Sequence, residues 1–246
     1  MKQHFISLGY FCSVASELES MGLRNESSPF DWLISDFEGV IKAIQNNFDN
    51  FLDYEYLSQN RQYPAYYLNT KYNVHFYHDF SPYIPLKKQL SLVKKKYSRR
   101  IKRFYESISE PTLFVRYISD EQLVNGSSKE LLWIEEHYDE IISLLKSFNE
   151  HNEILFIANE GNQSSKIEIY HVKKDENDVV NRRPIVSTPC LMERFNSFEL
   201  VNRSENLLRY KKKNKKMNRS VFKIKKKIVS FLQKTFMSEY THENQY

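Results

Sequence analysis

Cys12 is the residue of this 246-residue chain that is best placed to act as a nucleophile. Phe5 to Leu8 is apolar enough for a short buried strand, Gly9 permits a tight turn, and a helical pattern then continues to Met21. Cys12 therefore falls in the first turn of a helix that follows a strand, where backbone N–H groups and the helix dipole lower the pKa of a thiol. The same N–H groups, at Cys12 or Ser13, could hold an oxyanion. The alternative is that Cys12 is a small buried side chain, which is the usual fate of a free cysteine.

A base and an orienting carboxylate for this thiol would come from elsewhere in the chain. Residues 73–80 have the composition of a strand, on which His75 and His78 face opposite ways. One histidine of the two could then enter a site while the other stays outside it. Asp31 lies in a proline-led loop. It either accepts hydrogen bonds from loop N–H groups or orients a catalytic histidine.

Four short motifs occur together in the first half of the chain: Ser7-Leu-Gly-x-x-Cys12, Gly22-Leu-Arg24, Ser28-Pro-Phe-Asp-Trp-Leu33 and His75-Phe-Tyr-His-Asp-Phe80. Together they resemble a bacterial family of domains of unknown function that is described as papain-like cysteine peptidases. The resemblance extends more loosely through Phe114-Val-Arg-Tyr117. It implies a papain-like thiol enzyme with a Cys-His pair, either a cysteine peptidase or an acyl transferase.

The resemblance also implies roles for single residues. The family pattern matches His78-Asp-Phe80, so His78 is the expected base and His75 the other candidate. Cys12 would attack an acyl carbonyl, and His78 would take and return the proton. Asp31 or Asp79 would orient the imidazole. Without the resemblance, both histidines are ordinary strand or loop residues.

The spacing of apolar residues predicts several elements. Capping boxes at Ser35–Glu38 and Ser127–Glu130 predict helices that continue to about Phe51 and Phe148. The other expected elements are a helix over Leu86–Ile108, buried strands over Thr112–Ile118 and Ile154–Ala158, a further strand over Ser164–Val172 for which an antiparallel pairing is expected, and an irregular region over 173–206. The order strand, helix, strand from Thr112 to Ala158 predicts a βαβ unit with parallel strands.

The expected fold class is α/β, with a mixed, largely parallel sheet flanked by helices and a C-terminal basic amphipathic helix. The resemblance implies an α+β papain-like alternative. Arg116 is the one charge inside the strand over 112–118, so it needs a partner or it points into a site and binds an anion. Asn159 follows the next strand, at the edge where ligand sites gather. Ser13, Arg116 and Asn159 are therefore the predicted substrate-binding residues.

Length and composition predict one globular domain over residues 1–206 and an extension over residues 207–246. The two cysteines, Cys12 and Cys190, do not make a disulfide scaffold and fit a reducing cytoplasm. No secretory signal is apparent, and no apolar run approaches the roughly 20 residues that span a bilayer. The expected location is cytoplasmic. No Gly-rich phosphate loop, zinc-type Cys/His cluster or Gly-x-Ser-x-Gly elbow occurs, so no cofactor and no metal are predicted.

The charge of the chain is concentrated at one end. Residues 209–234 hold 12 of the 36 Lys and Arg residues and no Asp or Glu, so the rest of the chain carries a net charge of −7. A basic run followed by an amphipathic pattern over Ser220–Met237 suits an anionic membrane, here the inner face, contacted through residues 209–237. The alternatives are a helix packed on the body or contact with nucleic acid. Nucleic acid ranks last because no base-reading motif accompanies the run.

Two other functions are compatible with the sequence. Arg116 and the basic segment would suit a membrane-associated transferase that acts on an anionic glycan precursor. In the third hypothesis the chain is a non-enzymatic binding domain of the same fold, in which Cys12 and His78 are merely packed. The identity of the peptide, acyl or glycan substrate does not follow from the sequence.

Overall fold

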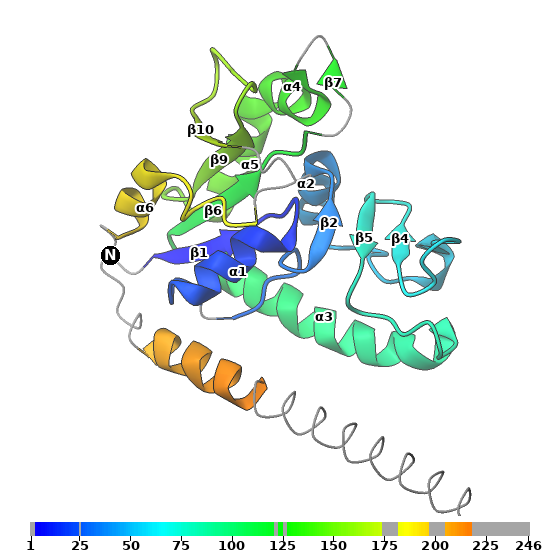
Figure 1. The fold of residues 1–246 in the computed structure, drawn as a ribbon. Helices are drawn as coiled ribbons and strands as arrows, with labels where there is room; N and C mark the ends of the chain where they lie inside the picture. Colours follow the sequence, from blue (N-terminus) through cyan, green and yellow to red (C-terminus); the bar gives the residue numbers. More distant parts are fainter. Residues whose placement is uncertain are drawn as a thin grey trace, which may run out of the picture.

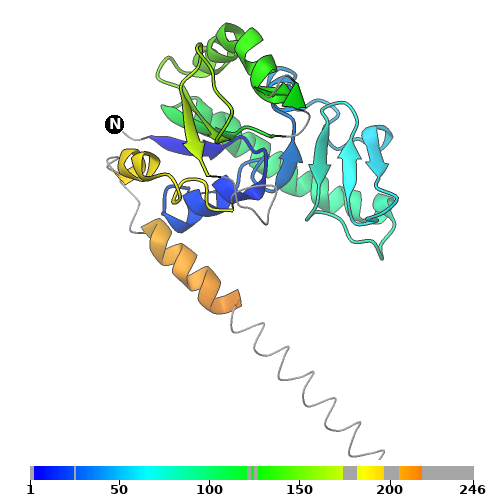
Figure 2. The same ribbon diagram turned by 45° about the horizontal axis from the view of Figure 1, so that its top comes forward.

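A four-stranded parallel sheet forms the centre of the molecule (Figure 1). Its strands, in spatial order, are β1 (His4–Ser7), β6 (Thr112–Tyr117), β9 (Glu153–Asn159) and β10 (Ile169–Val172). The structure is a computed structural model that describes residues 3–24, 26–120, 123–124, 127–173, 182–196 and 205–217. The fold is of the predicted α/β class, with helices on both faces of this sheet (Figure 2).

The two faces of the sheet bury separate apolar clusters because successive strand residues point to opposite sides. Val115 and Ile157 lie in the cluster with α1 (Cys12–Ser20) and α6 (Pro189–Asn196). Phe114 and Phe156 lie in the larger cluster on the other face. The helices of that face are α2 (Phe37–Gln45), α3 (Leu86–Ile108), α4 (Lys129–Glu136) and α5 (Tyr138–Phe148).

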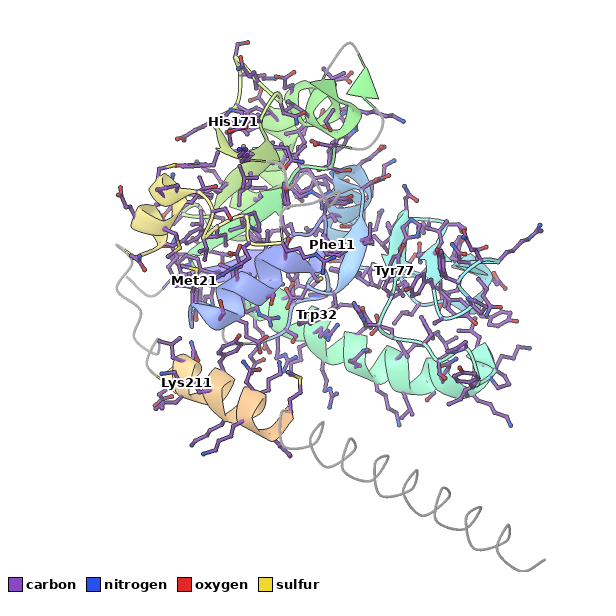
Figure 3. All side chains as sticks on the ribbon, in the orientation of Figure 1. Phe11, Met21, Trp32, Tyr77, His171 and Lys211 are labelled. Carbon is purple, nitrogen blue, oxygen red and sulfur yellow. The ribbon has the colours of Figure 1, made fainter. Side chains whose placement is uncertain are left out.

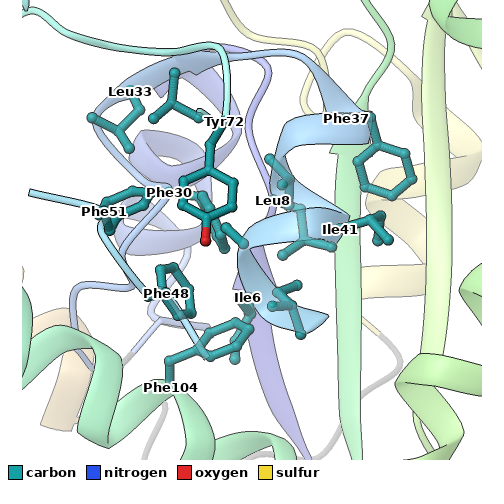
Figure 4. Packing of buried hydrophobic residues seen from close by; sticks show 14 of the residues in the cluster. Ile6, Leu8, Phe30, Leu33, Phe37, Ile41, Phe48, Phe51, Tyr72 and Phe104 are labelled. Carbon is teal, nitrogen blue, oxygen red and sulfur yellow. The ribbon is translucent and has the colours of Figure 1, made fainter. Parts of the chain in front are cut away.

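Aromatic rings fill the larger cluster (Figure 4). Phe48 packs against Phe30 and Phe104 with ring centroids 5.3 and 5.8 Å apart. Helix α2 comes so close to the backbone of Tyr72 that a Cβ on Gly39 would lie 1.7 Å from the Tyr72 carbonyl oxygen. Glycine is therefore the residue that this contact requires.

A second, antiparallel sheet of four short strands lies beside the parallel sheet (Figure 1). Its order is β2 (Leu33–Ser35), β5 (Val74–Phe76), β4 (Tyr67–Asn69) and β3 (Leu57–Gln59), with a 3₁₀ turn η1 (Tyr54–Tyr56) before β3. A two-stranded pair, β7 (Leu123–Val124) and β8 (Ser127–Ser128), precedes α4. The buried face of the second sheet includes Leu33, Tyr67 and Phe76, whereas Ile34 and His75 lie on its other face.

Several predicted elements are confirmed. Helix α3 has the predicted bounds, and β6 and β9 pair in parallel. Gly22 has φ +72° directly after the α1 C-cap, as a C-terminal glycine should. Short strand β5 lies inside the segment 73–80 that was predicted for it.

Other predictions are wrong. The strand at Ile169–Val172 pairs in parallel with β9, not antiparallel. The helix predicted to run to Phe148 is two helices that meet at His137, whose backbone (φ −106°, ψ 16°) interrupts the α conformation. The region predicted to be irregular contains α6, because Leu191 and Phe195, four residues apart, bury one helix face.

Both predicted capping boxes also need correction. The N-cap of α2 is Asp36, because Ser35 is the last residue of β2. The N-cap of α4 is Ser128, whose hydroxyl accepts a hydrogen bond from Leu131 N–H. In neither helix does a glutamate close the box, and Glu130 is engaged elsewhere.

Residues 205–217 are helical and contact the body near α1. The Asn206 amide donates to Gly22 O at 3.0 Å, and the Lys213 ammonium lies 2.7 Å from a Glu19 carboxylate oxygen. The rest of the predicted amphipathic helix, residues 218–237, lies outside the described residues. The boundary between a domain over 1–206 and an extension over 207–246 stays a prediction. No helix in the described ranges combines the length and apolar character needed to cross a bilayer.

Candidate functional site

A clamped turn places Cys12 at the carboxyl edge of the parallel sheet. Gly9 has φ +87°, and a Cβ there would lie 2.5 Å from Ser35 Oγ and 2.8 Å from Arg116 Nη1, so only glycine fits. Tyr10 N–H donates to Tyr117 O at 3.3 Å, and Tyr117 N–H donates to Gly9 O at 3.2 Å. The end of β6 thus fixes the turn from which α1 starts at Cys12.

The first turn of α1 has open hydrogen-bond donors. Its N-cap residue, Phe11, offers no side-chain cap, and no acidic residue lies in that turn. Within the described part of the chain, the Ser13 hydroxyl has no hydrogen-bond partner although the residue is only 4% exposed. These features provide donors that could bind an anion or a carbonyl oxygen beside Cys12.

The Cys12 thiol itself is half-buried. Burial raises its pKa above the ordinary value, and this effect exceeds the opposing effects of the Cys12 backbone N–H and the Arg182 guanidinium. The shift is thus opposite to the lowered pKa that was predicted for a thiol at a helix start. Reaction at this thiol requires a base.

His78 is exposed in the loop after β5. Its ring lies edge-to-face with Trp32, with centroids 6.4 Å apart, and among the described residues no hydrogen bond joins it to Cys12. The short strand β2 connects the two regions, because Trp32 precedes it and Ser35 N–H at its end donates to Tyr10 O at 3.2 Å. Three residues of strand correspond to about 10 Å.

Figure 3 marks Phe11 at the start of α1, and Trp32 and Tyr77 toward the second sheet. His75 in β5 lies opposite Ile34 in β2, and Ile34 is the residue directly before Ser35. It is therefore closer than His78 to the point where β2 meets the Cys12 turn. Both histidines stay candidates for the base.

Asp31 is fully buried and follows the first of its two predicted alternatives. Its carboxylate accepts a hydrogen bond from Ser28 N–H at 2.9 Å and pairs with the Arg24 guanidinium. Arg24 in turn pairs with Glu19 at 2.7 Å and lies over the Trp32 ring, 5.6 Å from its centroid. Asp31 therefore holds the loop that carries Trp32, and its hydrogen bonds do not reach a histidine.

Asp79 is held by α3. Its carboxylate pairs with the Lys96 ammonium and accepts a hydrogen bond from the Tyr97 hydroxyl at 2.9 Å. The Asp79 side chain is 2% exposed. These contacts anchor the loop after β5 to α3, and they direct the carboxylate toward α3.

Arg116 has a partner, which was the first of the two alternatives for an arginine inside a buried strand. It is 0% exposed, and Glu130 accepts hydrogen bonds from its Nε at 2.9 Å and Nη2 at 2.5 Å. Its Nη1 donates to Leu8 O at 2.8 Å, and its Nη2 donates to Ser35 O at 2.7 Å. In this structure the guanidinium is engaged within the protein, so binding of a substrate anion by Arg116 stays a prediction.

Asn159 is likewise engaged by its neighbours at the carboxyl edge. Its amide oxygen accepts a hydrogen bond from the Tyr117 hydroxyl at 2.6 Å, and its amide nitrogen donates to Asp120 at 2.6 Å. Asn162 donates to the same Asp120 carboxylate at 2.8 Å. Asn159 and Cys12 thus lie at one edge of the sheet, with the end of β6 between them.

Sequence reasoning missed Arg182 and Glu130. Arg182 acts on Cys12 from a segment predicted to be irregular, and its only sequence signal is the pair Arg182-Arg183. Glu130 was interpreted as part of a capping box, although a buried arginine in a preceding strand called for a carboxylate. Among the described residues, no cluster of three or more His, Cys, Asp or Glu side chains is arranged to hold a metal ion.

The comparisons with known proteins extend over the same part of the chain. A family model described as "Putative papain-like cysteine peptidase" matches residues 3–136, a range that includes Cys12, Asp31, His78 and Arg116. An uncharacterised protein of Acanthamoeba polyphaga mimivirus is 34% identical over 180 residues, which cover 65% of this chain and 79% of the relative. No solved structure gives a significant match. Since the family model covers more than half of the sequence, the chain belongs to the family described as putative papain-like cysteine peptidases.

Proposed function

We propose that the chain is a thiol-dependent enzyme in which Cys12 attacks an acyl carbonyl. The observation that carries the proposal is the position of Cys12, half-buried at the uncapped start of α1 and at the carboxyl edge of the sheet. Membership of a family described as papain-like cysteine peptidases supports the same chemistry. The reaction is peptide hydrolysis or acyl transfer.

The proposed mechanism begins with a protonated thiol, since burial raises the pKa of Cys12. His78 accepts the thiol proton as the sulfur forms a bond to the carbonyl carbon. The backbone N–H groups of the first turn of α1, with the Ser13 hydroxyl, hold the oxyanion. Collapse of the adduct breaks the bond to the leaving group, which takes the proton from His78. Water, or a second acceptor, then cleaves the thioester.

His78 is the proposed base because the family pattern includes it and because its ring is exposed. Among the described residues it makes no hydrogen bond that would occupy a ring nitrogen. Since no hydrogen bond joins His78 to Cys12 among the described residues, His78 would approach Cys12 with substrate bound. Catalytic hydrogen bonds are often long before substrate binds.

The test uses an activated ester, p-nitrophenyl acetate, and mass spectrometry of the intact chain in a Cys190→Ser background. We expect an acetyl adduct at Cys12 and a burst of nitrophenolate that Cys12→Ala removes. His78→Gln should slow acylation by about 10²-fold or more, and His75→Gln by only a few-fold. Loss of acylation in the His75→Gln variant alone would assign the role of base to His75. An acylation rate unchanged in both variants, or equal to that of an unfolded Cys12 peptide, would favour the non-enzymatic binding domain.

The second proposal concerns the basic segment over residues 209–237, which would bind an anionic membrane surface. Its described part supports this, because Lys211, Lys212, Lys215 and Lys216 are all exposed on the 205–217 helix. Replacing these four lysines with Gln should weaken sedimentation of the full chain with phosphatidylglycerol vesicles. Equal sedimentation of the variant and the wild type would discard this contact. Arg116 is already paired with Glu130, and this contact argues against the glycan-transferase alternative.

A further inference from the structure

The exposed side of α3 carries cations that the protein does not neutralise. Within the described ranges, four exposed basic residues near the start and middle of α3 form no ion pair: Lys87, Lys88, Lys95 and Arg99. By contrast, Lys94 in the same region pairs with Asp53 at 2.7 Å. An unpaired group of like charges on one helix is costly by itself, so it points to an anionic partner.

Three of these cations line a shallow groove. It has a volume of about 690 Å³ and is bounded by Lys87, Lys95 and Arg99 together with Ser91 and Ser98. The serine hydroxyls and the cationic groups are donors that suit phosphate oxygens. The lining residues lie between 87 and 99 of α3. This end of α3 runs beneath the second sheet, at the outer edge of the molecule (Figure 1).

Large apolar side chains are exposed at the same end of α3. Tyr83 is 92% exposed and Ile84 is 47% exposed in the loop that leads into the helix, and Leu92 is 70% exposed. Leu92 follows Lys88 by four residues and precedes Lys95 by three, so these three side chains share one helix face. A single exposed leucine needs no explanation, but several exposed apolar side chains grouped with unpaired cations form an amphipathic surface.

We propose that the start and middle of α3 and residues 83–84 form a docking surface for an anionic lipid bilayer. Lys88, Lys95 and Arg99 contact lipid headgroups, while Tyr83 and Leu92 insert at the boundary with the acyl chains. Nucleic acid would engage the cations through its phosphates but would leave Leu92 in water. The proposal is independent of the thiol chemistry and of the basic segment over 209–237.

The test is sedimentation of the full-length chain with vesicles of phosphatidylcholine alone or mixed with phosphatidylglycerol. Each basic residue near an anionic surface contributes about fivefold in affinity, so Lys88→Gln, Lys95→Gln and Arg99→Gln together should weaken binding to the mixed vesicles about 100-fold. Leu92→Ser should weaken it about tenfold. A matched control replaces Lys42, Lys146 and Lys166, which are exposed in other elements, with Gln.

The control has the same net charge as the α3 variant and should bind within a few-fold of the wild type. All variants keep the basic C-terminal segment, so equal binding of the α3 variant and the control would assign docking elsewhere and overturn the proposal. Tighter binding of the wild type to duplex oligonucleotide than to anionic vesicles at one ionic strength would also overturn it. Unchanged thermal unfolding of each variant shows that the fold is kept, and acylation of Cys12 is expected to be unaffected.

Discussion

Removing the Glu130 carboxylate should destabilise the protein strongly, because it would leave the buried Arg116 cation without a counter-charge. Glu130 accepts two hydrogen bonds from Arg116 and is also within hydrogen-bond distance of Phe37 N–H at 3.3 Å and Ser119 N–H at 3.4 Å. Breaking a buried ion pair from one side costs about 3–5 kcal/mol. We therefore expect Glu130→Ala to lower the free energy of unfolding by about this amount. For a chain of this size that is a fall in Tm of about 6–20 °C.

The matched control is Glu38→Ala. Glu38 borders the same cavity of about 190 Å³ as Glu130, but it is exposed and pairs only with exposed Lys42. Such a pair contributes at most about 1 kcal/mol. Urea unfolding followed by tryptophan fluorescence would measure both variants.

The same experiment separates a structural from a substrate-binding role for Arg116. Because Arg116 donates to Leu8 O and Ser35 O, it ties the Gly9 turn to the end of β2. Glu130→Ala should therefore loosen the turn and raise the rate of Cys12 alkylation in the folded protein. If Glu130→Ala unfolds within about 1 kcal/mol of the wild type, the reasoning is refuted. An Arg116→Ala variant of wild-type stability that loses acylation would instead place the guanidinium in a binding site.

Three further predictions follow from burial. Alkylation of Cys12 by iodoacetamide in the Cys190→Ser chain should rise with pH and inflect above the free-thiol value of about 8.5, because burial raises the pKa of Cys12; an inflection near 7 would contradict this. Burial also raises the pKa of Glu17. Between the unfolded-state pKa of about 4.3 and the raised folded-state pKa, the folded chain keeps a proton that the unfolded chain has lost. The free energy of unfolding should therefore fall as the pH rises through this range. Glu17→Gln should flatten this dependence of Tm on pH, and an unchanged slope would exclude Glu17 as its source. Asp31→Ala should cost about 1.5–3 kcal/mol, because Arg24 loses a buried charge-assisted hydrogen bond but keeps Glu19 as a partner. The acylation rate per folded molecule should stay within a few-fold, and selective loss of acylation at unchanged stability would make Asp31 a catalytic positioning residue.

The sequence alone determined most of the backbone around the site. Apolar spacing is enough to define α3, since its buried residues repeat with the helical period. The buried runs at β6 and β9, with a helical pattern between them, correctly predicted a parallel pair. Gly9 and Gly22 marked the two ends of the segment that carries Cys12, because each has a positive φ that other residues rarely adopt.

Only the tertiary structure decided where the charged side chains go. The local sequence around Glu130 predicts a helix cap and gives no reason for its side chain to bind Arg116. Local sequence likewise gives no reason for Asp79 to pair with Lys96. These choices depend on which elements meet in space and on the cost of leaving a buried charge unpaired. The parallel pairing of β10 and the burial that raises the pKa of Cys12 also depend on long-range packing. Periodicity encodes the elements, whereas partners, burial and pKa values follow from contacts between residues far apart in the chain.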